Sequence, residues 1–330
     1  MKSTRKCEER NAPEVALVED PMVFNSTHLE NFLTSVAVSS PLRDKNSTLY
    51  SDYDFLRKFN QGLTELEHEL HAGTAVADFP PIVIVGLPRT GSTYLSQVLI
   101  SSLHLAYVSN IMAKFFEAPL VGAQMSKLLV SDEDLLKLQF DSHLGRTSQL
   151  FGPSEYGWYW LNRIPFLSTN HEQVDESRMV ASMRRIQQEL GRVMTIYGRP
   201  LVVKCAVAPF ILDSFLENTD AFIVFIDRDL SEVSSSILKV RATYLESVND
   251  WWSIRPADWE SRLQLSPWEQ VSWQISTAHS AMLGAFRSHP GRSARVTFPQ
   301  LLKDPKSVAR EVARAYLKFS GFDVSFPARG

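Results

Sequence analysis

The stretch Ile82–Ile100 reads IVIVGLPRTGSTYLSQVLI and decides the fold of this chain. It opens with four consecutive apolar residues, which is the pattern of a short strand buried on both faces of a parallel sheet. Gly86 and Gly91 then bracket four residues, and Ser92-Thr93 follow. The apolar residues after Thr93 recur at helical spacing. The stretch therefore predicts a strand, a glycine-bracketed loop and a helix whose N-terminus faces an anion.

This loop departs at one position from the ATP- and GTP-binding pattern G-x-x-x-x-G-K-[ST]. The lysine after the second glycine is missing, and the positive charge lies inside the loop as Arg89. A planar guanidinium can grip a phosphate or neutralise charge on a bridging oxygen. The missing lysine is the group that reaches the β- and γ-phosphates of a nucleoside triphosphate. The loop therefore predicts an anion site and argues against ATP as its ligand.

Short apolar runs elsewhere predict further strands, and amphipathic stretches between them predict helices. The expected strands are residues 82–85, 105–108, 200–204, 221–226 and 294–297, and the expected helices are residues 28–37, 52–71, 210–216, 230–240, 267–287 and 307–319. Strands that alternate with helices indicate a mainly parallel sheet. We therefore expect an α/β, P-loop-like three-layer fold: a central, mainly parallel sheet flanked by helices, with a helical insertion at about residues 111–197.

The composition sets the class of protein and excludes several partners. The chain has 330 residues, of which 44% are hydrophobic and 22% charged, as in ordinary globular proteins. Residues 1–24 read as a mobile tail, and residues 25–330 lack a Gly-, Ser- or Pro-rich linker, which predicts a single domain. The net charge of −3 argues against nucleic-acid binding, so any anion site is local.

The same composition indicates a cytoplasmic protein that is not bound to a membrane. Only two cysteines are present, and the N-terminus has no apolar segment of the secretory kind. No stretch approaches the roughly 20 apolar residues that a membrane-spanning helix requires. The sequence carries no signal for an oligomeric state.

Residues 86–93, GLPRTGST, resemble the 5′-phosphosulfate loop of the PAPS-dependent sulfotransferases. The match is to the bacterial and tyrosylprotein-type branch, which carries Pro-Arg-[ST]-Gly-[ST]-[ST]. The donor in that family is 3′-phosphoadenosine 5′-phosphosulfate (PAPS), which has no β- and γ-phosphates for a metal ion to bridge, so the resemblance implies no metal. It also implies that the residues holding the 5′-phosphate are Arg89, Thr90, Gly91, Ser92 and Thr93.

A second match lies after the expected strand at residues 221–226, in the segment DRDLSEVSSS. The family's 3′-phosphate site has an arginine at a strand end and a serine eight residues later. Arg228 and Ser236 have this spacing. An arginine at the strand end and a hydroxyl two turns into the following helix can converge on one phosphate near the helix N-terminus. The resemblance therefore implies that Arg228 and Ser236 bind the 3′-phosphate.

Two further matches are partial. In LVVKCAVAPF, Lys204 stands where this branch carries a strand-end lysine, which implies that Lys204 stabilises charge on the leaving phosphate. The residues after Lys204 differ from the family's usual Lys-Asp-Pro. In ARVTFPQLLKDPKSVAREVARAYLKF, Asp304-Pro305 fits the family's C-terminal segment, whereas Phe298 replaces a common tyrosine. This last match supports the fold more than the site.

The residue that takes the acceptor's proton is not specified by the resemblance. The cytosolic branch uses a histidine two residues after its lysine, where this chain has Ala206, and the tyrosylprotein-type enzymes use a glutamate near the position of Asn110. Our preferred candidate is His143, because its ordinary pKa suits a general base near neutrality. The other candidates, as base or as a partner that orients His143, are Glu155, Glu117 and Asp141.

Sulfuryl transfer from PAPS to a hydroxyl or amine of a small-molecule acceptor, a natural product or a saccharide, is the function that these matches imply. The catalytic candidates are Arg89, Lys204, Glu155 and His143. The acceptor pocket is expected between residues 111–197 and 244–266, whose aromatic side chains either line it or pack the core: Tyr156, Trp158, Tyr159, Trp160, Trp251, Trp252 and Trp259.

Two alternatives to a sulfotransferase remain open at this point. An ATP-dependent kinase or another P-loop NTPase would use Asp227, at the end of an apolar strand, as a Mg²⁺ ligand. A nucleotide-sensing protein would keep the anion site and lack the transfer chemistry.

Overall fold

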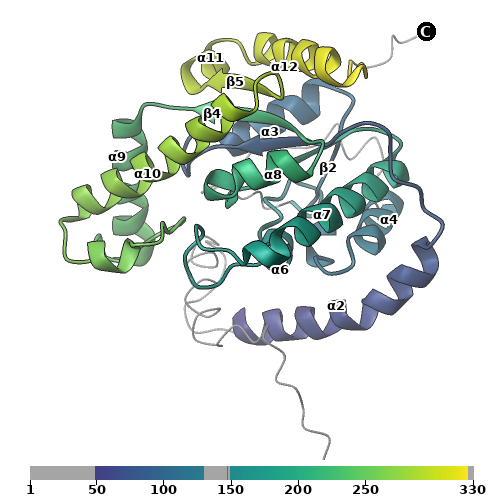
Figure 1. Cartoon of the computed structure of the whole chain (residues 1–330), viewed down its shortest axis with the longest axis horizontal. Coiled ribbons are helices and arrows are strands. Elements are labelled where there is room, and N and C mark those ends of the chain that lie inside the picture. Colours follow the sequence, from purple (N-terminus) through teal and green to yellow (C-terminus); the bar gives the residue numbers. More distant parts are fainter. Residues whose placement is uncertain (1–48, 130–146, 148, 326–330) are drawn as a thin grey trace, which may run out of the picture.

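The computed structural model describes residues 49–129, 147 and 149–325 of the chain. In this part, one parallel sheet has the strand order β2-β3-β1-β4-β5 (Figure 1). The strands are β1 (Ile82–Val85), β2 (Ala106–Tyr107), β3 (Leu201–Lys204), β4 (Phe222–Asp227) and β5 (Ser293–Thr297). Each expected strand is confirmed, and the observed ends differ from the expected ones by at most one residue.

The central position of β1 follows from its four buried apolar residues. The strand pairs in parallel with β3 on one side and with β4 on the other. Its side chains alternate between the two faces, so that Ile82 and Ile84 pack into one apolar core and Val83 and Val85 into another. A strand that is apolar on both faces requires a layer of helices on each side.

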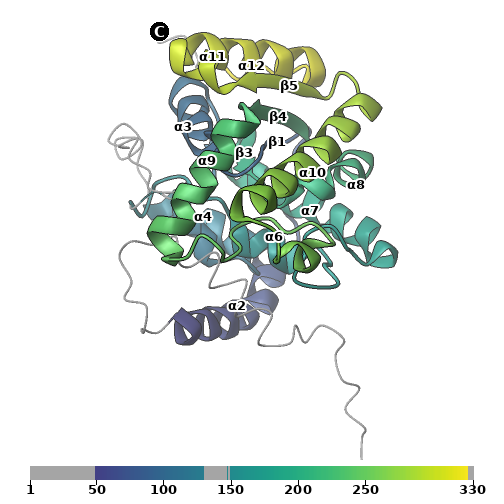
Figure 2. The same cartoon turned by 90° about the vertical axis from the view of Figure 1, so that its left-hand side faces the viewer.

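Helices supply both layers (Figure 2). The face of Ile82 and Ile84 is covered by α3 (Ser92–Ser102), α11 (Phe298–Lys303) and α12 (Pro305–Ser320). The face of Val83 and Val85 is covered by α7 (Glu176–Tyr197), α8 (Leu212–Asn218), α9 (Leu230–Val240) and α10 (Pro267–Ser288). The expected α/β three-layer fold with a parallel central sheet is confirmed.

The expected helical insertion lies on the second of these faces. Its described elements are η1 (Met112–Lys114), α4 (Pro119–Leu129), α6 (Gly157–Arg163) and α7. The N-terminal helix α2 (Leu49–His71) packs against this layer, at the edge far from α12 (Figures 1 and 2). On α2, the Glu67 carboxylate accepts hydrogen bonds from the backbone N–H groups of Leu120 and Val121, at 2.9 and 3.0 Å. The expected tail and the expected helix at residues 28–37 lie outside the described residues.

Local sequence signals set the ends of several elements. The Ser266 hydroxyl and the Glu269 carboxylate form the reciprocal hydrogen bonds of a capping box at the start of α10. The helix expected at residues 210–216 is confirmed as α8, which begins and ends two residues later and follows a short 3-10 helix, η2 (Ala208–Phe210). The segment between α9 and α10 contains only the π-helix η3 (Arg241–Leu245) and the 3-10 helix η4 (Trp259–Arg262) and is otherwise irregular.

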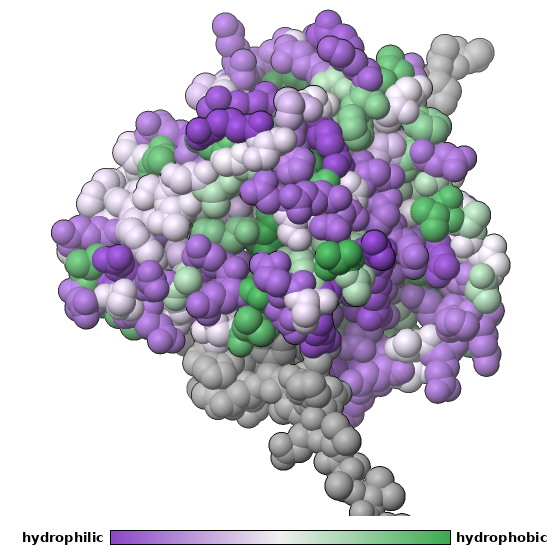
Figure 3. Space-filling model, viewed as in Figure 1, coloured by the Kyte–Doolittle hydropathy of each residue, from purple (hydrophilic) through white to green (hydrophobic). Residues whose placement is uncertain are grey.

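The surface in Figure 3 is mostly hydrophilic, with hydrophobic residues in small separate patches. Exposed apolar side chains on α2 and α4 include Phe55, Leu70 and Leu128. Among the described residues, no helix combines the length and the apolar character that crossing a bilayer requires.

Gly91 is required by the geometry of the loop after β1. Its φ is +93°, and a Cβ at this position would lie 2.6 Å from two ring carbons of Phe298. We expect Gly91→Ala to lower the free energy of unfolding by about 1–3 kcal/mol, because the variant combines backbone strain with a clash. Denaturant unfolding followed by circular dichroism measures this loss.

Gly284→Ala is the matched control for this substitution. Gly284 lies within α10, and nothing stands within 4 Å of a Cβ built on it. Alanine is the better helix former, so the free energy of unfolding should stay the same or rise by up to about 1 kcal/mol. Equal losses in the two variants would show that Gly91 carries no special strain.

Candidate functional site

The loop between β1 and α3 is shaped by two close approaches of its backbone. A Cβ on Gly86 would lie 2.8 Å from the Ile226 side chain and 2.9 Å from the Thr90 hydroxyl. Gly91 caps α3 with a left-handed backbone and offers no side chain to the first turn. Thr90 is buried, and its hydroxyl donates to the Leu87 carbonyl at 2.7 Å. The Thr90 side chain thus closes the loop, while the glycines leave room for a ligand at the N-terminus of α3.

Arg89 links this loop to the second cationic motif. Its backbone is left-handed, with a φ of +69°. Its Nε donates to the Ser236 hydroxyl on α9 at 3.1 Å. The Arg228 Nη1 in turn donates to the Arg89 carbonyl at 3.1 Å. The three residues predicted for the two ends of a donor nucleotide therefore lie together, although Ser236 contacts Arg89 rather than Arg228.

The Arg228 side chain is held from two further directions. Its Nε donates to the Glu232 carboxylate one turn along α9, at 2.8 Å. Its guanidinium carbon lies 4.4 Å from the centroid of the Phe298 ring. The same ring fills the space beside Gly91. Phe298 thus contacts both cationic motifs. In the sequence it was only a marker of the fold, and nothing in its own segment pointed to these contacts.

Lys204 reaches the same loop from the neighbouring strand. Because β3 pairs with β1, the end of β3 lies beside the start of the loop. The Lys204 amine donates to the Thr93 hydroxyl at 3.1 Å and forms an ion pair with the Glu155 carboxylate. The exposed fractions of the two charged side chains are 12% for Lys204 and 33% for Glu155. Glu155, Lys204 and Thr93 therefore form one polar chain that remains open to solvent at Glu155.

The site concentrates positive charge in a half-buried place. Burial lowers the pKa of the Arg89 guanidinium, and the Arg228 charge lowers it further, while Tyr244 and Glu155 oppose both effects. Two guanidinium groups held this close repel each other. A bound anion would relieve that repulsion, and so the arrangement is suited to phosphate or sulfate groups.

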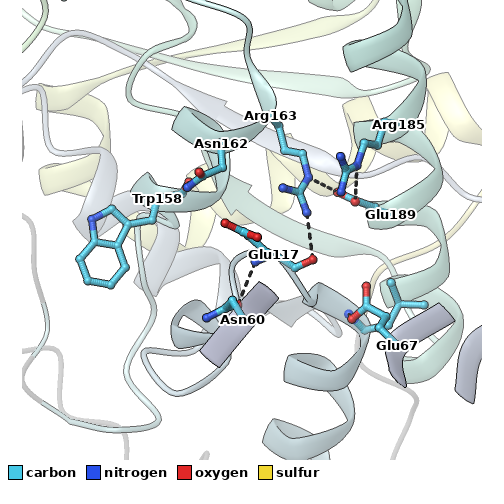
Figure 4. A network of polar contacts seen from close by, with 9 residues as sticks. Asn60, Glu67, Glu117, Trp158, Asn162, Arg163, Arg185 and Glu189 are labelled. Carbon is cyan, nitrogen blue, oxygen red and sulfur yellow. Dashed lines mark hydrogen bonds and ion pairs between the residues drawn. The ribbon is translucent and has the colours of Figure 1, made fainter. Parts of the chain in front are cut away.

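The remaining candidate bases are placed differently. His143 and Asp141 lie outside the described residues. The Asn110 side-chain amide donates to the Thr147 carbonyl and hydroxyl and to the Gln149 carbonyl, and so it supports a turn. Glu117 belongs to a polar network between α2, α6 and α7, where burial raises its pKa (Figure 4). Among the glutamate candidates, Glu155 is the one that contacts Lys204.

Both carboxylate oxygens of Asp227, the Mg²⁺ ligand expected of an NTPase, contact side chains of the protein. One carboxylate oxygen lies 3.2 Å from the His279 Nε2, and the other is paired with Arg295. Both oxygens thus bind groups from α10 and β5, which tie the end of β4 to its neighbours. In the described ranges, no three His, Cys, Asp or Glu side chains are arranged to hold a metal ion.

Most of the aromatic residues expected near an acceptor belong to the core. The buried members are Tyr156, Tyr159, Trp160, Trp251 and Trp252. Trp158 and Trp259 are only partly buried. Of these seven residues, therefore, Trp158 and Trp259 are the ones that keep surface for contact with a ligand.

Comparisons with known proteins identify the family of this chain and support its fold. A model of the sulfotransferase family matches residues 80–317. Sulfotransferase STF9 from Mycobacterium avium is similar in structure, with a TM-score of 0.51 and 14% identity, over 88% of this chain and 78% of that one. At this identity, the similarity supports the fold alone.

Two other solved sulfotransferases have lower TM-scores against this chain. STF1 from Mycobacterium tuberculosis has a TM-score of 0.48 and 16% identity, over 88% of this chain and 82% of that one. The enzyme from Alicyclobacillus acidocaldarius has a TM-score of 0.36 and 15% identity, over 76% of this chain and 85% of that one. A comparison with curated proteins gives no match. Because the family model spans the sheet from β1 to β5, together with the loop and both cationic strand ends, the chain belongs to the sulfotransferase family.

Proposed function

We propose that this sulfotransferase takes its sulfuryl group from PAPS and transfers it to a hydroxyl or amine of a small-molecule acceptor, a natural product or a saccharide. The observation that carries the proposal is the convergence of Arg89, Ser236 and Arg228 at the loop after β1. Lys204 joins them by its hydrogen bond to Thr93. A nucleotide with phosphate at both its 3′ and 5′ positions is complementary to such a cluster.

The donor is expected to bind along the N-terminal end of α3. On this proposal, its 5′-phosphate would be held by the loop residues Arg89, Thr90, Gly91, Ser92 and Thr93. Arg228 and Ser236 would hold its 3′-phosphate. Because the Arg89 Nε and the Ser236 hydroxyl already share a hydrogen bond, an incoming phosphate would join or replace that bond. The phosphate would also compete with the Glu232 carboxylate for the Arg228 guanidinium.

Lys204 is proposed to stabilise the leaving group. The bound donor supplies an activated sulfuryl group, and charge develops on the bridging oxygen as that group departs. A fixed ammonium within a half-buried site stabilises such charge far better than one in bulk water. The contacts with Thr93 and Glu155 keep the Lys204 amine in a defined place before the reaction.

Glu155 is proposed to assist the acceptor. Its carboxylate is partly exposed and contacts Lys204, so it lies between solvent and the proposed reacting centre. From there it can accept the proton of an attacking hydroxyl or amine as general base. His143 remains a second predicted base, and Glu155 would then orient it. Trp158, on the helix that follows Glu155, offers an aromatic surface for the acceptor.

Ligand-dependent thermal stability tests the identity of the donor. Adenosine 3′,5′-bisphosphate in EDTA should raise the melting temperature, because binding at 100 times the Kd adds about 2.7 kcal/mol to stability. Adenosine 5′-monophosphate should raise it less, since it lacks the 3′-phosphate. Stabilisation by Mg·ATP but not by the bisphosphate would instead indicate an NTPase. Bisphosphate binding without transfer from sulfur-labelled PAPS to any acceptor in a broad panel would indicate a sensor.

Removal of either proposed catalytic cation should slow sulfuryl transfer. We expect Arg89→Ala and Lys204→Ala each to cost about 2–4 kcal/mol of transition-state stabilisation, the scale of losing one preorganised electrostatic donor. The measurement is kcat/KM with labelled PAPS. Arg314→Ala and Lys318→Ala remove the same charges from the exposed side of α12 and are the matched controls. Turnover near that of the controls would refute the assigned role.

Substitution of the proposed base should separate chemistry from donor binding. Glu155→Gln keeps the size of the side chain and removes its negative charge. We expect kcat to fall by roughly 10²-fold or more, with the Kd for adenosine 3′,5′-bisphosphate changed only a few-fold. The same assays on Glu117→Gln and His143→Ala compare the other candidates. Unchanged turnover in Glu155→Gln, with a large loss in one of these, would move the base role to that residue.

A further inference from the structure

Trp160, on α6, forms a direct link to the backbone of Lys204. Its indole N–H donates to the Lys204 carbonyl at 2.8 Å. The indole is buried, with 1% of the residue exposed. A buried N–H that lost this acceptor would have no water to replace it, so the bond is strongly favoured. It ties the end of β3, where the Lys204 side chain begins, to the middle of α6.

The same short helix is connected to the other end of the Lys204 side chain. Glu155, two residues before the start of α6, forms the ion pair with the Lys204 amine. Lys204 is thus held at its carbonyl by Trp160 and at its amine by Glu155. Because both partners belong to one continuous segment, a shift of α6 would move both contacts together.

The position of α6 is itself fixed by a buried ion pair at its C-terminal end (Figure 4). Arg163 is almost fully buried, and its Nε donates to the Glu189 carboxylate of α7 at 2.8 Å. Its Nη2 donates to the Glu117 carbonyl at 3.3 Å. Arg185 holds the second oxygen of Glu189 at 2.9 Å. These contacts anchor α6 to α7 and to the segment before α4.

Aromatic packing fixes the plane of the Trp160 ring between that anchor and Lys204. The ring packs edge-on against Tyr159 at 5.1 Å and against Phe215 at 6.2 Å, measured between ring centroids. Tyr159 stacks on Tyr156 at 4.4 Å, and the Arg163 guanidinium lies 5.1 Å from the Tyr159 ring. In this packing the indole N–H points toward the Lys204 carbonyl.

We propose that Trp160 is a positioning residue for sulfuryl transfer, acting through Lys204. The hydrogen bond from its indole holds the end of β3 at the depth where the Lys204 amine meets both Thr93 and Glu155. This proposal rests on the proposed function for its effect on turnover. Its effect on the Lys204 side chain does not depend on which donor or acceptor the protein uses.

Trp160→Phe removes the N–H and keeps an aromatic ring in the core. In the transfer assay with PAPS, we expect kcat to fall roughly tenfold, as for a small displacement of a catalytic group. The Kd for adenosine 3′,5′-bisphosphate should stay within about twofold, because the hydrogen bonds that join Arg89, Arg228 and Ser236 do not involve Trp160. An unchanged kcat would overturn the proposal.

A double-mutant cycle separates positioning from general loss of stability. In the Lys204→Ala background, Trp160→Phe should have no further effect on kcat, because the Lys204 amine that Trp160 positions is already absent. A full additional loss in that background would overturn the proposal. Tyr316→Phe is the matched control, since the Tyr316 hydroxyl is a buried aromatic donor to the Pro80 carbonyl at 2.7 Å, on the opposite face of the sheet. It should leave kcat unchanged.

A readout without turnover tests the same link. Acetylation of Lys204 by limiting acetic anhydride, followed by mass spectrometry, reports how firmly its amine is held. We expect the labelling rate to rise severalfold in Trp160→Phe and to match the wild type in Tyr316→Phe. Equal rates in all three proteins would overturn the positioning role. If the wild type transfers no sulfuryl group but this difference appears, the proposed function fails and the positioning of Lys204 stands.

Discussion

The site depends on two guanidinium groups, those of Arg89 and Arg228, that are held close together. Arg228 donates to the carbonyl of Arg89, and Arg89 donates to the hydroxyl of Ser236. These bonds place like charges in a half-buried position, where burial and mutual repulsion lower the pKa of Arg89. Glu232 pairs with Arg228 and offsets part of this repulsion, and a bound anion would offset more of it. The fold around it supplies the packing that holds both side chains in place.

The sheet order is what brings these groups together. The central strand β1 leads into the loop with Arg89, and its two neighbours, β3 and β4, end at Lys204 and just before Arg228. Since parallel strands end at the same edge, three cationic side chains far apart in sequence reach one place. The buried, uniformly apolar β1 makes this order stable, because only a strand shielded on both faces can occupy the centre.

The second layer of support comes from outside the strands. Phe298 packs against both Gly91 and Arg228, and so the C-terminal segment stabilises the loop and the second motif at once. On the other side, α6 contacts Lys204 through Trp160 and is anchored by the Arg163–Glu189 pair. Desolvation offsets much of the attraction within a buried ion pair, so we attribute to the Arg163–Glu189 contact chiefly the placement of α6 against α7.

Much of this architecture could be predicted from the sequence because it depends on local patterns. The apolar run at residues 82–85, the bracketing glycines and the helical spacing after Thr93 predicted strand, loop and helix in the observed places. The spacing of Arg228 and Ser236 predicted a shared site, since both positions belong to one strand–helix unit. The sulfotransferase family itself followed from these same short motifs.

Contacts between distant segments could not be predicted in the same way. No periodicity in the chain indicates that Arg89 meets Ser236, that Phe298 fills the space beside Gly91, or that Trp160 bonds to the carbonyl of Lys204. The sequence alone determined which residues carry charge, where the chain turns and which short runs form strands, because those properties depend on near neighbours. Only the tertiary structure decided which of these residues touch, because the direction of a side chain depends on the packing of helices distant in the chain.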